Sequence, residues 1–140
     1  MRKTSAWPLS QLCVALIVYA SLYPFEHWRD QDIAPWAFLS APWPKYWTGF
    51  DVGANVLGYA PLGFFVCLSA MRLAWPGRPL VWAMGLSALL SFTMEGLQSY
   101  LPARVPSQVD FLLNVLGATG GAVLAGALEP VGAQHLLGVA

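Results

Sequence analysis

Four long apolar runs constrain this chain more than any other feature of its sequence. They cover residues 7–25, 51–73, 80–100 and 108–128, and an α-helix needs about 20 mostly apolar residues to cross a bilayer. Backbone N–H and C=O groups inside lipid must find partners within the chain, so each run is expected to be a helix. We therefore predict an all-α integral membrane protein, a four-helix bundle made of two helical hairpins in a single domain over residues 1–140.

The composition excludes the common soluble classes. Of the 140 residues, 57% are hydrophobic and 10% are charged, and the mean hydropathy is +0.56, whereas a soluble domain carries about 25% charged residues. So much apolar surface does not fit inside a soluble domain of this size. Seven basic residues balance seven acidic ones, so no charge excess indicates a nucleic-acid partner. Cys13 and Cys67 lie inside apolar runs, which argues against a disulfide framework and a cysteine-based zinc site.

The basic residues favour one orientation. Arg2 and Lys3 precede the first run, and Arg72 and Arg78 lie in the second loop, so we expect both termini in the cytoplasm and a first helix that is retained rather than cleaved.

In either orientation, four spans place the first and third loops on the same side of the bilayer. Six of the seven acidic residues then share that face with three basic ones: Glu26, Arg29, Asp30, Asp32, Lys45, Asp51, Glu95, Arg104 and Asp110.

A repeated motif begins the second and fourth runs. Lys45, Thr48, Asp51, Asn55 and Gly58 recur, 59 residues later in each case, as Arg104, Ser107, Asp110, Asn114 and Gly117. The repeat indicates either a duplicated hairpin or two helices that converged on the same starting pattern.

Each copy of the motif resembles a capping box with Asp in place of Glu, and a carboxylate in the first turn suits the positive end of a helix. On that interpretation Asp51 and Asp110 only begin their helices. Asn55 and Asn114 need a further explanation, because each lies one turn deeper on the same stripe as its Asp, where an amide in lipid needs a partner. The partner is either a neighbouring helix or a ligand.

Glu95 is the most informative single residue. It stands near the end of the third run within apolar sequence, and an acid at membrane depth is costly unless it is paired, protonated or facing water. Gln98 shares its helix face. Arg104, in a short loop stiffened by prolines, is expected to pair with Glu95, with Asp110 or with an anionic ligand. The opposing interpretations are an interfacial Glu95 and a solvated Arg104.

The motif set resembles the VanZ-like family of small bacterial membrane proteins over nearly the whole chain. The resemblance rests on Asp51, Asn55, Tyr59 and Pro61-Leu62-Gly63, followed by Glu95, Gln98, Arg104, Asp110, Asn114 and Gly117 in matching order and spacing. It implies a multi-pass protein of the bacterial plasma (inner) membrane. The founding member is linked to resistance to teicoplanin, a lipidated glycopeptide antibiotic, but the resemblance implies no settled activity. If the family motifs mark a site, its residues here are Asp51, Asn55, Glu95, Gln98, Arg104, Asp110 and Asn114.

Three functions remain open at this point. The first is binding of an amphiphile, either a lipid-linked cell-envelope precursor or a lipidated glycopeptide, at the outer membrane face. The second is an enzyme acting on a lipid headgroup or glycan, with Glu95 and Asp110 as acid and base. The third is a structural role, with the polar residues clamping helices together.

No cofactor is expected. If a metal ion did bind, oxygen ligands of this kind would suit magnesium or calcium rather than zinc. A homo-oligomer is permitted by the small-residue helix faces.

The first loop, residues 26–50, is rich in Trp and Pro. Tryptophan favours the headgroup level of a bilayer. We therefore expect this loop to lie on the membrane as a lid over the polar site.

Overall fold

The computed structural model describes residues 4–129 and confirms the four-helix prediction. The helices are α1 (Ala6–Leu22), α2 (Gly49–Arg72), α3 (Pro79–Gln98) and α4 (Gln108–Leu128), and a short 3-10 turn, η1 (Ala37–Ser40), lies between α1 and α2. No strand occurs within this described part of the chain. The predicted runs therefore correspond to the observed helices, with differences of up to three residues at their ends.

Local chemistry explains where the helices begin and end. Pro24 disfavours a helical conformation at Tyr23, so α1 ends at Leu22 rather than at the predicted Phe25. Hydroxyl side chains cap the even-numbered helices, Thr48 at α2 and Ser107 at α4. Proline occupies the first position of α3, where its missing N–H would have no helical partner in any case.

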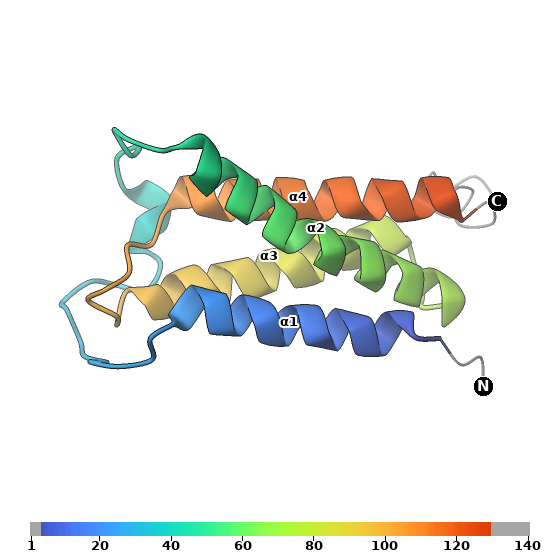
Figure 1. The fold of residues 1–140 in the computed structure, drawn as a ribbon, viewed down its shortest axis with the longest axis horizontal. Helices are drawn as coiled ribbons and strands as arrows, with labels where there is room; N and C mark the ends of the chain where they lie inside the picture. Colours follow the sequence, from blue (N-terminus) through green and yellow to red (C-terminus); the bar gives the residue numbers. More distant parts are fainter. Residues whose placement is uncertain (1–3, 130–140) are drawn as a thin grey trace.

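The helices alternate in direction, so both long loops lie at one end of the bundle (Figure 1). We refer to this as the loop end. The first residues of α1 and the last residues of α4 lie at the opposite end together with the α2–α3 turn. As expected for four successive spans, the first and third loops share a side, and α2 and α4 run in the same direction.

Helices α2 and α4 form the closest pair, because glycines let their backbones meet. A methyl group on Gly63 would collide with the carbonyl of Ala118, one on Gly117 with the carbonyl of Val56, and one on Gly121 with that of Ala60. Gly117 and Gly121 are one turn apart, as in small-residue helix contacts within membranes. Gly58 differs from its counterpart Gly117, because nothing lies within 4 Å of the position its Cβ would take.

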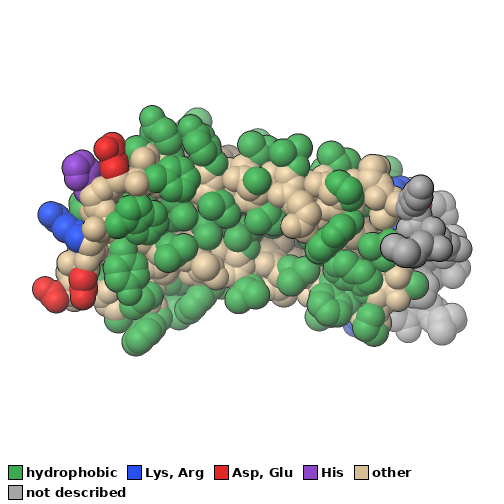
Figure 2. All heavy atoms as spheres, turned by 90° about the horizontal axis from the view of Figure 1, so that it is seen from below, with side chains coloured by type: hydrophobic (Ala, Val, Ile, Leu, Met, Phe, Trp, Pro, Cys, Tyr) green, Lys and Arg blue, Asp and Glu red, His purple; other side chains and the backbone are tan. Residues whose placement is uncertain are grey.

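The outer surface fits a bilayer. Helices α2, α3 and α4 are each long and apolar enough to cross a membrane, whereas α1, with 17 residues, is at the lower end of the spanning range of about 17–25 residues. Apolar side chains cover the middle of the molecule in Figure 2, and charged ones lie toward its two ends, most of them at the loop end. Trp75 packs edge-on against Trp7 and Trp82 near the opposite end, as expected at an interface.

The first loop packs on the ends of α3 and α4. Phe38 of η1 is buried against Phe92 and Phe111. The backbone N–H of Arg29 donates to the carbonyl of Tyr100 at 3.0 Å. The loop is therefore part of the folded structure and is held by the second hairpin.

Candidate functional site

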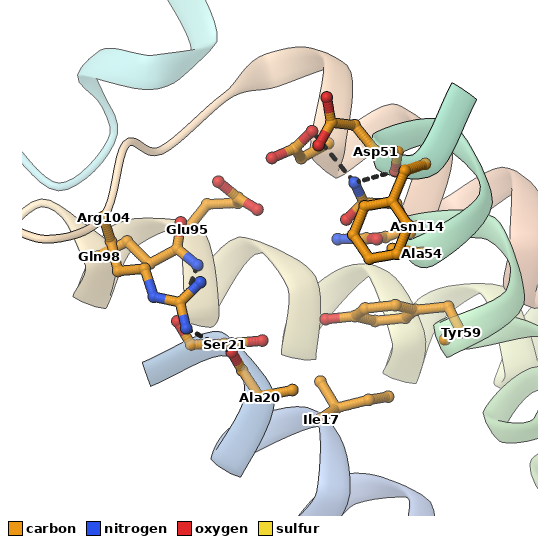
Figure 3. Close-up of a pocket in the computed structure, with 14 residues that line it drawn as sticks. Ile17, Ala20, Ser21, Asp51, Ala54, Tyr59, Glu95, Gln98, Arg104 and Asn114 are labelled. Carbon is orange, nitrogen blue, oxygen red and sulfur yellow. Dashed lines mark hydrogen bonds between the residues drawn. The ribbon is translucent and has the colours of Figure 1, made fainter. Parts of the chain in front are cut away.

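A polar cavity of about 310 Å³ lies at the loop end of the bundle, between all four helices. The seven polar residues predicted from the sequence all line it (Figure 3). The remaining lining residues are Ile17, Ala20 and Ser21 of α1 and Phe50, Ala54, Gly58 and Tyr59 of α2. The structure thus brings together side chains from both hairpins.

The α2 side of the cavity begins with a complete capping box. The N–H of Asp51 donates to Thr48 Oγ1 at 3.2 Å, and the N–H of Thr48 donates to Asp51 Oδ2 at 2.8 Å. These two bonds confirm the predicted helix-start role of Asp51. Asp51 is exposed, and it lies at the rim of the cavity. One turn deeper, Asn55 Nδ2 donates both to the carbonyl of Asp51 at 2.8 Å and to Asp110 Oδ1 at 3.2 Å.

The α4 side begins differently, and the expectation of a second capping box is wrong in one respect. Ser107 Oγ accepts from the N–H groups of Val109 and Asp110 as predicted. The N–H of Ser107, however, donates to Glu95 Oε2 at 2.8 Å rather than to Asp110. Because Glu95 of α3 takes this role, the Asp110 carboxylate is left to accept from Asn55 and to face the cavity.

Glu95 is buried although it lies close to the end of α3. Only 3% of it is exposed, so it is enclosed by the protein rather than solvated. The carboxylate accepts from the N–H of Ser107, the N-cap of α4, where the positive end of the helix dipole stabilises an anion. Within residues 4–129 no Lys, Arg or His forms an ion pair with it.

Arg104 pairs with neither Glu95 nor Asp110, so two of the three partners expected from the sequence are wrong. Its Nε donates to the carbonyl of Tyr23 and its Nη2 to the carbonyl of Ala20, both at 2.8 Å. These carbonyls end α1 and have no partner within the helix, and a cation suits that end of the helix dipole. Arg104 therefore ties the third loop to α1 while its side chain lines the cavity.

Two buried polar atoms in the cavity wall have no hydrogen-bond partner among the described residues. They are the hydroxyl of Tyr59 and Oδ1 of Asn114, in residues that are 4% and 3% exposed. The Tyr59 hydroxyl points into the cavity (Figure 3), and the Asn114 amide donates to Ser91 Oγ at 2.9 Å. Sequence reasoning did not include Tyr59 in the site, although it follows Asn55 by one turn on the same stripe of α2.

A family model now supplies the decisive comparison: VanZ/LLP1 matches residues 3–129. The chain belongs to the VanZ/LLP1 family. No curated protein and no solved structure matches it significantly. The sequence-based assignment to VanZ-like proteins is therefore confirmed, and the geometry above describes how this VanZ/LLP1 protein arranges the residues of its motifs.

Two further features of this VanZ/LLP1 protein concern the site. Among residues 4–129, no three His, Cys, Asp or Glu side chains converge closely enough to hold a metal ion. Of the first loop, residues 26–50, only Phe50 lines the cavity, so most of the loop does not cover it as the expected lid would. The loop packs on the second hairpin instead, because burying Phe38 there removes a large apolar side chain from water.

Proposed function

We propose that this protein binds the polar headgroup of a membrane amphiphile in the cavity at the loop end. One observation carries the proposal: a polar cavity built from all four helices opens in a bundle whose outer surface is apolar. Polar side chains are costly to bury at the edge of a membrane and are retained where they serve a ligand or pathway. A purely structural clamp would leave no such volume and no unpartnered buried oxygen in its wall.

The cavity walls support entry from the side. Ala20 of α1 and Ala54 and Gly58 of α2 line the cavity and are exposed. Small side chains on facing helices leave a gap through which a headgroup can enter while its tail stays in lipid. A volume of about 310 Å³ is at the lower end of small-molecule sites, so it suits a headgroup rather than a whole lipid.

The candidate amphiphiles are a lipid-linked intermediate of the cell envelope and a lipidated glycopeptide. We place the loop end at the outer face of the bacterial inner membrane, with both termini in the cytoplasm, on the basis of the basic residues near the first and second helices. The VanZ resemblance supports a lipidated glycopeptide such as teicoplanin, and the lateral opening suits a lipid-linked precursor equally well.

Two glycines of α2 allow a matched experiment. A side chain added at Gly58 would enter the cavity, whereas one added at Gly53 would not, and neither Cβ would meet an atom within 4 Å. Gly58→Leu and Gly53→Leu remove the same helix-destabilising residue and add the same side chain. Binding of teicoplanin and of a polyprenyl-linked disaccharide-pentapeptide is measured by native mass spectrometry on detergent-solubilised protein.

We expect at least one of these amphiphiles to bind the wild type and the Gly53→Leu protein and to be lost, by about tenfold or more, from the Gly58→Leu protein. Absence of binding by the wild type, or equal binding by the two variants, overturns the proposal.

A further inference from the structure

Each amide and guanidinium side chain that lines the cavity donates at least one hydrogen bond to the protein itself. Both N–H groups of the Asn55 amide are used, and Gln98 Nε2 donates to the carbonyl of Ser21 at 2.9 Å. The Asn114 amide donates to Ser91, and Arg104 donates from two of its three nitrogens to the end of α1. These side chains thus hold helices together, although, within the described part of the chain, Arg104 keeps three of its five N–H groups free, and Gln98 and Asn114 keep one each.

Unused acceptors are present as well. Asn114 Oδ1 is buried without a partner, and the Tyr59 hydroxyl, equally buried and unpartnered among the described residues, points into the cavity (Figure 3). The hydrogen bonds between described residues use one oxygen of Glu95 and one of Asp110, although each carboxylate can accept about four. The cavity lining contains three carboxylates and one guanidinium, so the formal charge of the lining is negative.

We propose that the group bound in this cavity is a primary ammonium carried by the amphiphile, held by Asp110, Asn114 and the Tyr59 hydroxyl. This inference rests on the proposed function and names the headgroup chemistry. An ammonium offers three N–H donors and no acceptor, which suits a lining whose formal charge is negative and whose Asp110 carboxylate has an oxygen that the described residues leave unused. A phosphate offers only acceptors, and it would face three carboxylates and an arginine whose Nε and Nη2 are already engaged.

Three single-chain probes with the same tail test this inference: dodecylammonium, N-dodecylacetamide and dodecyl phosphate. Their affinities for the detergent-solubilised protein are measured by calorimetry. The Gly58→Leu protein is the control, because heat that it gives with a probe comes from partition of that probe into micelles. We expect dodecylammonium to bind about tenfold more tightly than N-dodecylacetamide, because its hydrogen bonds are charge-assisted. Dodecyl phosphate is expected to bind most weakly.

Two substitutions assign the preference to the cavity. Asp110→Asn should remove most of the preference for ammonium over acetamide, but it also alters the bond from Asn55. Tyr59→Phe avoids that complication, since the hydroxyl it removes has no partner among the described residues. We expect Tyr59→Phe to weaken dodecylammonium binding about fivefold while the thermal unfolding temperature is unchanged.

The outcomes separate this inference from the proposed function. If all three probes bind equally, or if phosphate binds best, and Gly58→Leu abolishes that binding, the amphiphile site stands and the ammonium assignment is overturned. If Gly58→Leu leaves the binding of every probe unchanged, both proposals fail. Ammonium binding by Tyr59→Phe at the wild-type level also overturns the assignment of the hydroxyl.

Discussion

The two copies of the repeated motif, residues 45–58 and 104–117, share the same residue types but end in different structures. In the first copy, Thr48 and Asp51 bond to each other at the exposed start of α2. In the second copy, Ser107 bonds to Glu95 of α3, and Asp110 is left free to accept from Asn55 of the first copy. The same local pattern thus serves once as a helix start and once as a wall of the cavity.

The glycines of the two copies differ in the same way. Gly58 borders the cavity with open space around it, whereas Gly117 lies against the backbone of Val56. The first copy therefore depends mainly on contacts within its own turn, and the second depends on other helices. Substitutions at equivalent positions should have unequal effects, and that inequality can be measured.

The largest difference is expected between Gly117→Ala and Gly58→Ala. A methyl group at Gly117 collides with the Val56 carbonyl, so α2 and α4 must separate, and we expect a loss of about 3 kcal/mol in unfolding free energy. A methyl group at Gly58 meets nothing, and removing a glycine from a helix interior should stabilise by about 0.5–1 kcal/mol. Denaturant unfolding in detergent followed by circular dichroism compares the two variants. Equal losses would mean that the two glycines occupy similar environments.

The second difference concerns the carboxylates that accept from the two N-cap N–H groups. Glu95→Ala leaves the Ser107 N–H without its acceptor in a partly buried site, at an expected cost of about 2 kcal/mol. Asp51→Ala leaves the Thr48 N–H exposed to solvent, at an expected cost of about 0.5–1 kcal/mol. The same unfolding assay measures both. Glu95→Gln is the control: it keeps an oxygen acceptor, so it should recover most of the loss, and failure to recover would assign the effect to charge instead.

The sequence predicts the parts of this structure that depend on neighbouring residues. Apolar run length predicts all four helices, and the spacing of Thr48 and Asp51 predicts a bond within one turn. Helical periodicity and the shared loop end also suffice to gather the seven polar residues, since each lies near a helix end on that side.

The same reasoning fails where the partner is distant in the chain. Arg104 bonds to carbonyls more than 80 residues away, and Glu95 replaces Asp110 at the start of α4. In both cases several acceptors of similar chemistry are available, and only the packing of the helices decides between them. The Tyr59 hydroxyl was overlooked for a related reason: an aromatic residue in an apolar helix is usually core, and only the cavity beside it makes its hydroxyl significant.

The contact between the copies should appear as coupling between Asn55 and Asp110. We expect a double-mutant cycle with Asn55→Ala and Asp110→Ala to give about 1 kcal/mol of interaction energy, because the amide donates to a charged acceptor. The reciprocal cycle, Asn114→Ala with Asp51→Ala, should give none, since Asn114 bonds to Ser91 instead. Coupling in both cycles would mean that the copies are arranged symmetrically, contrary to the structure.

The smallest effect is expected from exchanging the caps, with Thr48→Ser and Ser107→Thr. Both hydroxyls accept from N–H groups in the first turn of their helices, and the two residues are close in N-cap preference, so each exchange should change the unfolding free energy by less than about 0.5 kcal/mol. Thr48→Ala and Ser107→Ala are the controls and should each cost about 1 kcal/mol in the same assay. If the exchanges are neutral, the unequal behaviour of the copies comes from Glu95, Val56 and Asn55 on other elements. If Ser107→Thr is costly while Thr48→Ser is not, the packing around the α4 cap itself separates the copies.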